Sequence, residues 1–167
     1  MVRNGTRRDA RRAWSRAARD STPAVRRRAT ELAPQIATPS ARTLIALVRD
    51  PDPLVAESAA FACGEVTWEG NRRALVVRAL DVAARHDDAL VRESAVAALG
   101  SLGDPAGLPA VLAACADQPS VRRRAVLALA PFDGPEVDAA LATALTDSDW
   151  QTRQAAEDLL AWTPDAD

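Results

Sequence analysis

The sequence predicts an all-α solenoid built from about five stacked helical hairpins. One motif recurs with a period near 30 residues, and its apolar positions follow the 3.6-residue period of a helix, with no period-two alternation. The composition agrees, because only two Phe, four Trp and no Tyr are present and the core must be built from Ala, Leu and Val. Small side chains and strong helix formers favour closely packed helices.

The repeated motif starts at an acidic turn and continues into a helix. Its anchor is a Val, usually followed by Arg, with Ala four residues later and apolar residues seven and eight residues later. These offsets share one helix face. The anchors are Val25, Val55, Val91, Val121 and, in the last copy, Thr152. We expect the core stripe to comprise the anchors with Ala29, Leu32, Ala33, Ala59, Ala62, Cys63, Ala95, Ala98, Leu99, Ala125, Ala128, Leu129, Ala156, Leu159 and Leu160.

A second apolar helix is predicted ahead of each anchored helix. These helices cover about 6–19, 39–49, 71–85, 106–116 and 135–146. Gly103-Asp104-Pro105, Pro131 and Gly134-Pro135 supply helix stops between them. A period of this length means one hairpin per copy, stacked on its neighbours. We therefore expect one domain over 1–167, with hairpins at about 6–34, 38–66, 71–102, 105–131 and 134–162.

The motif resembles HEAT repeats and the HEAT-like repeats of phycobilin lyases. It is clearest over 87–103, which reads Asp-Asp-Ala-Leu-Val-Arg-Glu-Ser-Ala-Val-Ala-Ala-Leu-Gly-Ser-Leu-Gly. The resemblance implies a right-handed α-α superhelix whose Val-Arg helices line the concave surface. It also implies a ladder between turn Asp and helix Arg side chains. The arginine positions of this ladder are filled by Arg26, Arg92, Arg122 and Arg153, with Asp20, Asp50, Asp87, Asp117 and Asp147 nearby. In the second copy Ala56 takes the place of the arginine and interrupts the ladder.

Charge is distributed unevenly along the chain. All 21 basic residues are Arg, and ten of them lie in residues 1–28 with only Asp9 and Asp20 opposing them. A basic N-terminus can be an arm for nucleic acid or membrane, but a solvated first helix that caps the array is the favoured interpretation. No apolar segment follows these arginines, and no run is long enough to span a membrane. With Cys63 and Cys115 interpreted as free buried thiols, a cytoplasmic protein is expected.

Side chains that carry chemistry are sparse. The single His, His86, lies at a helix junction and leaves no base for a Ser or Cys nucleophile elsewhere. Carboxylate pairs occur at Asp50/Asp52, Asp87/Asp88 and Asp147/Asp149, but each pair precedes a helix, where capping explains it. The sequence therefore predicts no enzyme, no cofactor and no metal site.

The expected binding surface is the concave face. Offsets of two and six residues from each anchor lie opposite the core stripe at 100° per residue. In the middle repeats they select an apolar strip rimmed by charges: Glu57, Phe61, Glu93, Ala97, Arg123 and Leu127. Such a strip suits a protein or peptide partner, although solenoid curvature could instead bury Phe61 and Leu127 between repeats.

Two other functions compete with this hypothesis. Nucleic-acid binding, as in HEAT-like DNA glycosylases, would use Arg26, Arg27, Arg28, Arg122, Arg123 and Arg124. A lyase subunit resembling the phycobilin lyases has the resemblance in its favour and no reactive constellation. Trp68 is a possible separate contact. It lies in the longer loop between the second and third anchors, 65–73, and either folds back over the joint or projects toward a partner.

Overall fold

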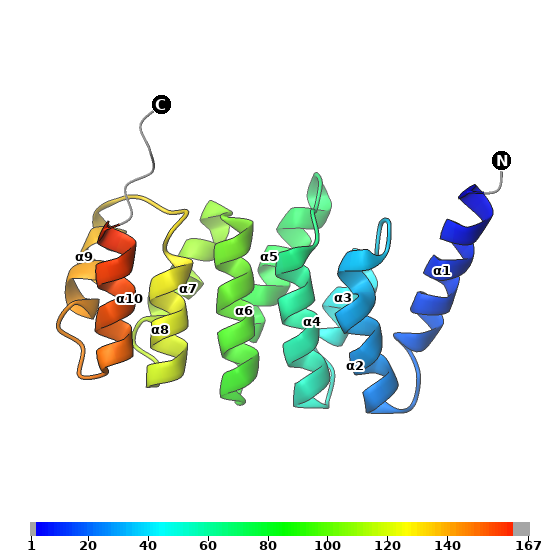
Figure 1. Ribbon diagram of the computed structural model, residues 1–167, viewed down its shortest axis with the longest axis horizontal. Helices are drawn as coiled ribbons and strands as arrows, with labels where there is room; N and C mark the ends of the chain where they lie inside the picture. The colour runs from blue at the N-terminus through cyan, green and yellow to red at the C-terminus, as the bar shows by residue number, and fades with distance from the viewer. Residues whose placement is uncertain (1–2, 162–167) are drawn as a thin grey trace.

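The computed structural model describes residues 3–161, and the surroundings of side chains from residue 7 onward. Over this range the chain contains helices and connecting turns only. The helices are α1 (Arg3–Ala17), α2 (Pro23–Leu32), α3 (Ala41–Leu47), α4 (Pro53–Glu65), α5 (Asn71–Ala83), α6 (Ala89–Leu102), α7 (Leu108–Ala114), α8 (Pro119–Ala128), α9 (Pro135–Ala144) and α10 (Trp150–Ala161), with 3₁₀ turns η1 (Ala33–Gln35) and η2 (Pro105–Gly107). Figure 1 shows them as successive hairpins along one axis.

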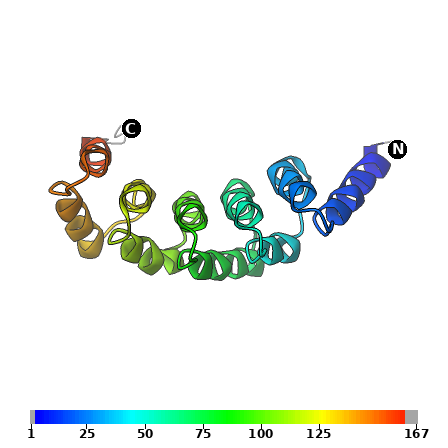
Figure 2. The same ribbon diagram turned by 90° about the horizontal axis from the view of Figure 1, so that it is seen from below.

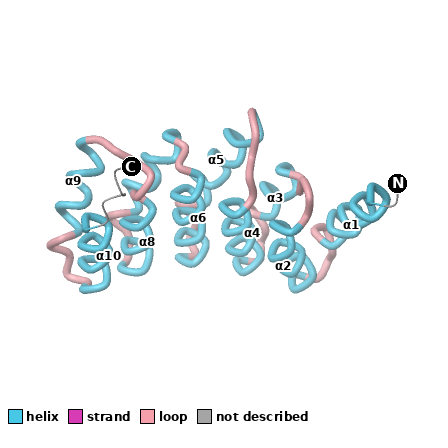
Figure 3. The backbone as a smooth tube through the Cα atoms, turned by 45° about the horizontal axis from the view of Figure 1, so that its top comes forward, coloured by secondary structure: helices cyan, strands magenta, loops and turns pink. Residues whose placement is uncertain are grey.

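The hairpins form two rows of helices around an arc. In Figure 2 the even-numbered helices lie side by side on the inner side of the arc, and the odd-numbered helices lie on its outer side. The tube in Figure 3 shows the helices of the two rows joined by loops, of which the one between α4 and α5 projects farthest. The inner row contains every Val-Arg helix, so the predicted assignment of these helices to the concave surface is confirmed.

Local sequence signals account for most helix ends. Asp52 precedes α4 and accepts from the backbone N–H groups of Leu54 and Val55, and Asp88 precedes α6 and accepts from the N–H of Leu90. These bonds satisfy donors that the first helical turn leaves without partners. At the other end of α6, Gly103 adopts φ +57°, a left-handed conformation that terminates a helix and that glycine reaches without strain. The hairpin boundaries thus follow from turn chemistry.

The core runs continuously through the stack. In the three middle hairpins every predicted stripe residue is buried, and Val55, Val91 and Val121 are fully enclosed. The stripe is wrong at the two ends, where Val25 and Leu160 are exposed. In the middle hairpins the equivalent residues are covered because a hairpin lies on each side. The first and last hairpins have a neighbour on one side only, so Val25 and Leu160 are left uncovered.

Two glycines on the inner row allow close packing between successive hairpins. A Cβ at Gly64 would lie 2.9 Å from Cα of Ala98, and a Cβ at Gly100 would lie 2.7 Å from Cα of Ala128. Such separations are below van der Waals contact, so only glycine permits this approach of α4 to α6 and of α6 to α8.

The long connection between α4 and α5 folds back onto the stack. Trp68 is buried, and its indole Nε1 donates to the carbonyl of Cys63 at 2.8 Å. This contact covers the end of α4 and satisfies the only polar group of the indole. Of the two interpretations of this loop, Trp68 therefore follows the folded-back one, and as a buried side chain it is not a projecting contact.

Candidate functional site

The six predicted surface residues lie on the inner row, on α4, α6 and α8. Phe61 is 55% exposed and Leu127 is 42% exposed, so curvature does not bury them between hairpins. Ala97, between them on α6, is half-buried. Large apolar side chains left in solvent along one face are typical of a binding surface.

Two more apolar residues extend this strip. Leu54 on α4 and Leu90 on α6 are exposed, and each lies one residue before its anchor. At 100° per residue, a residue one position before the anchor points within about 20° of the direction of a residue six positions after it. Leu54 and Leu90 therefore share one side of the inner helices with Phe61 and Leu127. Including the position one residue before each anchor, beside the offsets of two and six residues, would have identified Leu54 and Leu90 from the sequence. We call Leu54, Phe61, Leu90 and Leu127, together with Ala97, the apolar strip.

The charged residues beside the strip join neighbouring hairpins. Glu57 Oε1 accepts from the hydroxyl of Ser94 on α6 at 3.1 Å. Glu93 lies 3.6 Å from the guanidinium of Arg124 on α8. Arg123 donates to Gln151 Oε1 on α10 at 2.7 Å. These contacts leave Glu57, Glu93 and Arg123 half-buried, with part of each side chain still facing solvent.

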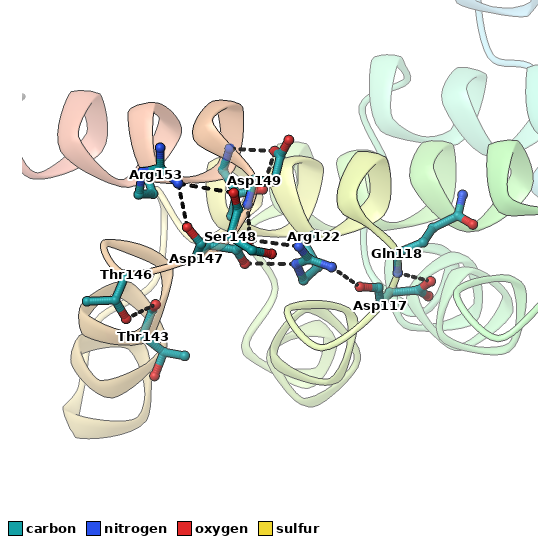
Figure 4. Close-up of polar contacts among 10 residues, drawn as sticks. Asp117, Gln118, Arg122, Thr143, Thr146, Asp147, Ser148, Asp149 and Arg153 are labelled. Carbon is teal, nitrogen blue, oxygen red and sulfur yellow. Dashed lines mark hydrogen bonds and ion pairs between the residues drawn. The ribbon is translucent and has the colours of Figure 1, made fainter.

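An arginine–aspartate ladder holds the inner row in place. Arg26 pairs with Asp50, Arg92 with Asp117 and Arg122 with Asp147, each through Nε and Nη2 to both carboxylate oxygens at 2.7–2.8 Å. Each arginine also donates Nη1 to carbonyls of the turn before its own helix. Figure 4 shows Arg122 between Asp117 and Asp147. Such bidentate pairs fix orientation as well as distance.

The ladder is interrupted where the sequence indicates. At position 56 the methyl group of Ala56 is fully buried, and no guanidinium links α4 to the turn before α6. There, the Glu57–Ser94 bond and the close approach at Gly64 join the two helices. Arg153 in the last hairpin donates only to the carbonyls of Asp147 and Ser148 within the described range, since no later turn supplies a carboxylate there.

The ladder shifts the pKa values of its carboxylates. The hydrogen bond from Arg92 lowers the pKa of Asp117, and the bond from Arg122 lowers the pKa of Asp147. For Asp50 burial acts to raise the pKa, but the bonds from Arg26 and the Asp52 N–H outweigh it and the pKa is lowered. These acids therefore bind protons less readily in the folded state than in the unfolded one.

The lowered pKa values predict acid destabilisation. A carboxyl whose pKa is depressed by folding adds stability above its unfolded pKa, about 3.9, and loses it as pH falls toward the folded value. The free energy of unfolding should therefore decrease from about pH 5 downward. Urea titrations across this range would measure it. Asp117→Asn should reduce the slope, and an unchanged slope would mean that the Arg92–Asp117 pair does not contribute.

The arginines considered for nucleic acid are mostly engaged within the chain. Arg26 and Arg122 belong to the ladder. Arg27 and Arg28 lie 3.4 and 2.8 Å from Glu31, and Arg124 and Arg123 contact Glu93 and Gln151. The two arginine clusters, 26–28 on α2 and 122–124 on α8, thus lie on the inner row, but most of these arginines are paired with carboxylates of the chain.

The remaining candidate groups have structural partners. Asp52, Asp88 and Asp149 accept from N–H groups of the helices that they precede, and His86 Nδ1 accepts from the N–H of Asp88. Burial raises the pKa of the Cys63 thiol to about 12, which keeps it protonated at neutral pH. Burial also raises the pKa of Cys115 to about 11, and both thiols are free.

Within 3–161 no three His, Cys, Asp or Glu side chains gather in a way that could hold a metal ion. None of the helices in that range combines the length and apolar character that crossing a bilayer requires.

Comparisons with known proteins extend these observations. A family model described as HEAT repeats matches residues 76–161. No curated protein matches the chain by sequence. Two crystal structures of engineered proteins are similar in fold, one with a TM-score of 0.67 and 18% identity, over 89% of this chain and 76% of the other. The second has a TM-score of 0.65 and 21% identity, over 89% and 78%.

A third similar structure is that of human deoxyhypusine hydroxylase. Its TM-score is 0.47 and its identity 16%, over 88% of this chain and 82% of the other, and nothing about activity follows from a likeness of that extent. The family model covers more than half of the sequence, including the hairpins in which the motif is clearest. Together with the stacked hairpins and the arginine–aspartate ladder, this match shows that the chain belongs to the HEAT-repeat family.

Proposed function

We propose that the chain is a non-catalytic scaffold that binds a protein or peptide partner along the apolar strip of its concave face. The observation that carries this proposal is the exposure of four large apolar side chains, Leu54, Phe61, Leu90 and Leu127, along one side of α4, α6 and α8. Exposing large apolar side chains is unfavourable in water, and covering them with a partner recovers that free energy.

The surface is also preorganised. The inner helices lie side by side (Figure 2), and the ladder and the Glu57–Ser94 bond hold successive hairpins together. A rigid surface loses little conformational entropy when a partner binds. Extended concave surfaces of this kind are what helical solenoids use for recognition, which supports the assignment.

Charge along the strip suggests the partner's chemistry. Glu57 and Glu93 flank the strip on α4 and α6, whereas Arg123 and Arg124 flank it on α8. A complementary partner would present apolar side chains along one face, with basic groups toward α4 and α6 and acidic groups toward α8. An amphipathic helix or an extended peptide meets these requirements.

Affinity capture from the native lysate tests the proposal. The wild type is compared with Phe61→Glu/Leu127→Glu, with nuclease added to both and circular dichroism confirming both folds. We expect a specific protein to be captured by the wild type and lost with the variant, because two carboxylates would be buried unpaired under the partner.

A matched control separates the strip from general effects of added charge. Leu75 and Val82 are exposed on α5 in the outer row, and Leu75→Glu/Val82→Glu adds the same charge there. Capture should survive in this control. A protein retained by Phe61→Glu/Leu127→Glu, or lost equally with both variants, would show that the concave strip is not the binding surface.

A further inference from the structure

Helix α1 and the turn after it present a dense set of exposed guanidinium groups. They are Arg7, Arg8, Arg11, Arg12, Arg16 and Arg19. The only carboxylate on this segment before Asp20 is Asp9, and none of the six arginines lies within ion-pair distance of a carboxylate among residues 7–161. This contrasts with the inner row, where carboxylates oppose most arginines.

The spacing of these arginines does not benefit the helix itself. Arg7 and Arg11, Arg8 and Arg12, and Arg12 and Arg16 are four residues apart. Like charges at this spacing are neighbours on a helix surface and destabilise it. An anionic ligand would remove the repulsion.

The arginines line a continuous trough. A recess of about 870 Å³ lies between α1 and the segment 36–38, bounded by Arg7, Arg8, Arg11 and Arg12. A second recess of about 590 Å³ continues along α1 and shares Arg11 and Arg12. From Arg7 to Arg16 the helix rises about 14 Å. In Figures 1 and 2, α1 lies at the end of the stack, next to α2 and clear of the other even-numbered helices.

The opposite wall of the trough carries backbone strain. Thr38 adopts φ +86°, and within the described residues it is the only non-glycine residue with a positive φ. A β-branched residue is disfavoured in this region, and strain of this kind is concentrated at ligand-binding segments. The wall also includes Ile36 and Ala37, which give it apolar character.

The α1 segment is fixed in place, but its exposed side lacks an apolar anchor. Trp14 is buried, and its Nε1 donates to the carbonyl of Ala29 at 2.7 Å, which fastens α1 to α2. With Trp14 buried, the exposed side offers arginines and small residues. Insertion into a lipid surface requires a large apolar face, and tight protein interfaces usually have a buried aromatic or aliphatic centre. Phosphate binding requires neither, since clustered cations suffice.

We infer that the trough along α1 binds the phosphodiester backbone of single-stranded nucleic acid. The guanidiniums pair with phosphates, and Ile36 and Ala37 contact sugars or bases. A single strand fits because it can follow the trough while contacting only α1 and 36–38. A duplex is wider and would meet the rest of the surface, where the residues after position 28 carry a net charge of −10. This site is separate from the apolar strip and does not depend on the function proposed for it.

Fluorescence anisotropy with a labelled oligothymidylate tests the inference. We expect binding at low salt that weakens with added salt, with a slope of log K against log salt of about −3 for four contacts. The variant Arg7→Gln/Arg8→Gln/Arg11→Gln/Arg12→Gln should lose at least about tenfold in affinity and most of the salt slope. The Phe61→Glu/Leu127→Glu protein should bind like wild type if the two surfaces are independent.

A control of equal charge makes the test specific. Arg42, Arg49, Arg72 and Arg78 are exposed on α3, α5 and the loops beside them, and changing all four to Gln removes the same charge. This protein should retain both affinity and salt slope. The inference is overturned if wild type fails to bind at low salt, if the control loses as much affinity as the α1 variant, or if duplex DNA or anionic vesicles bind more tightly than the single strand.

Discussion

Leu99→Ala is expected to lower the free energy of unfolding by about 2–5 kcal/mol. Leu99 is fully enclosed in α6, at the middle of the stack, and its side chain packs against Gly107, the last residue of η2. Truncation leaves a cavity between two hairpins, and both lose contacts there. Urea denaturation followed by circular dichroism measures the change.

The same substitution at Leu90 provides the control. Leu90 lies on the same helix but is exposed. Leu90→Ala should change stability by no more than about 0.5 kcal/mol. If both variants were destabilised equally, or neither were, the assignment of the core stripe on α6 would be wrong.

Gly100→Ala should destabilise the protein by about 1–3 kcal/mol, against the usual preference of helices for alanine. In an exposed helix interior this change would stabilise by about 1 kcal/mol. Here the new Cβ would lie 2.7 Å from both Cα and Cβ of Ala128. Because backbone atoms cannot turn aside, α6 and α8 must separate, and packing is lost along their contact. The measurement is the shift in urea midpoint.

Ser101→Ala is the matched substitution for this prediction. Ser101 is the next residue on α6, is exposed and already carries a Cβ, so Ser101→Ala adds no atom between helices. It should leave stability unchanged or raise it slightly. A stability increase in Gly100→Ala would show that the two helices can move apart without cost.

Predicted and observed core positions agree in the middle of the stack and differ at its ends. The period and the anchor offsets placed the helices and the three middle core stripes correctly, because both follow from helix geometry alone. The same reasoning failed at Val25 and Leu160, which occupy stripe positions but lie in end hairpins. Burial requires a covering neighbour, and an offset within one helix carries no information about that neighbour.

The arginine–aspartate ladder and the glycine contacts depend on how neighbouring hairpins are rotated, which the sequence pattern does not predict. The sequence places Asp and Arg at matching positions, yet which Asp each Arg reaches depends on the rotation between hairpins: Arg92 pairs with Asp117 of the next turn, not with Asp87 of its own. The closeness of Gly100 to Ala128 also depends on that rotation. No spacing along the chain predicts it.

By itself, the sequence determined the all-α class, the hairpin count and the core-facing stripe of the three middle inner helices, because these depend on local propensity and a 3.6-residue period. Only the tertiary structure decided that Phe61 and Leu127 stay exposed, that Trp68 folds back, and that the arginines of α1 remain without carboxylate partners in the described chain. Exposure and charge pairing depend on distances between hairpins, which the stacking geometry sets.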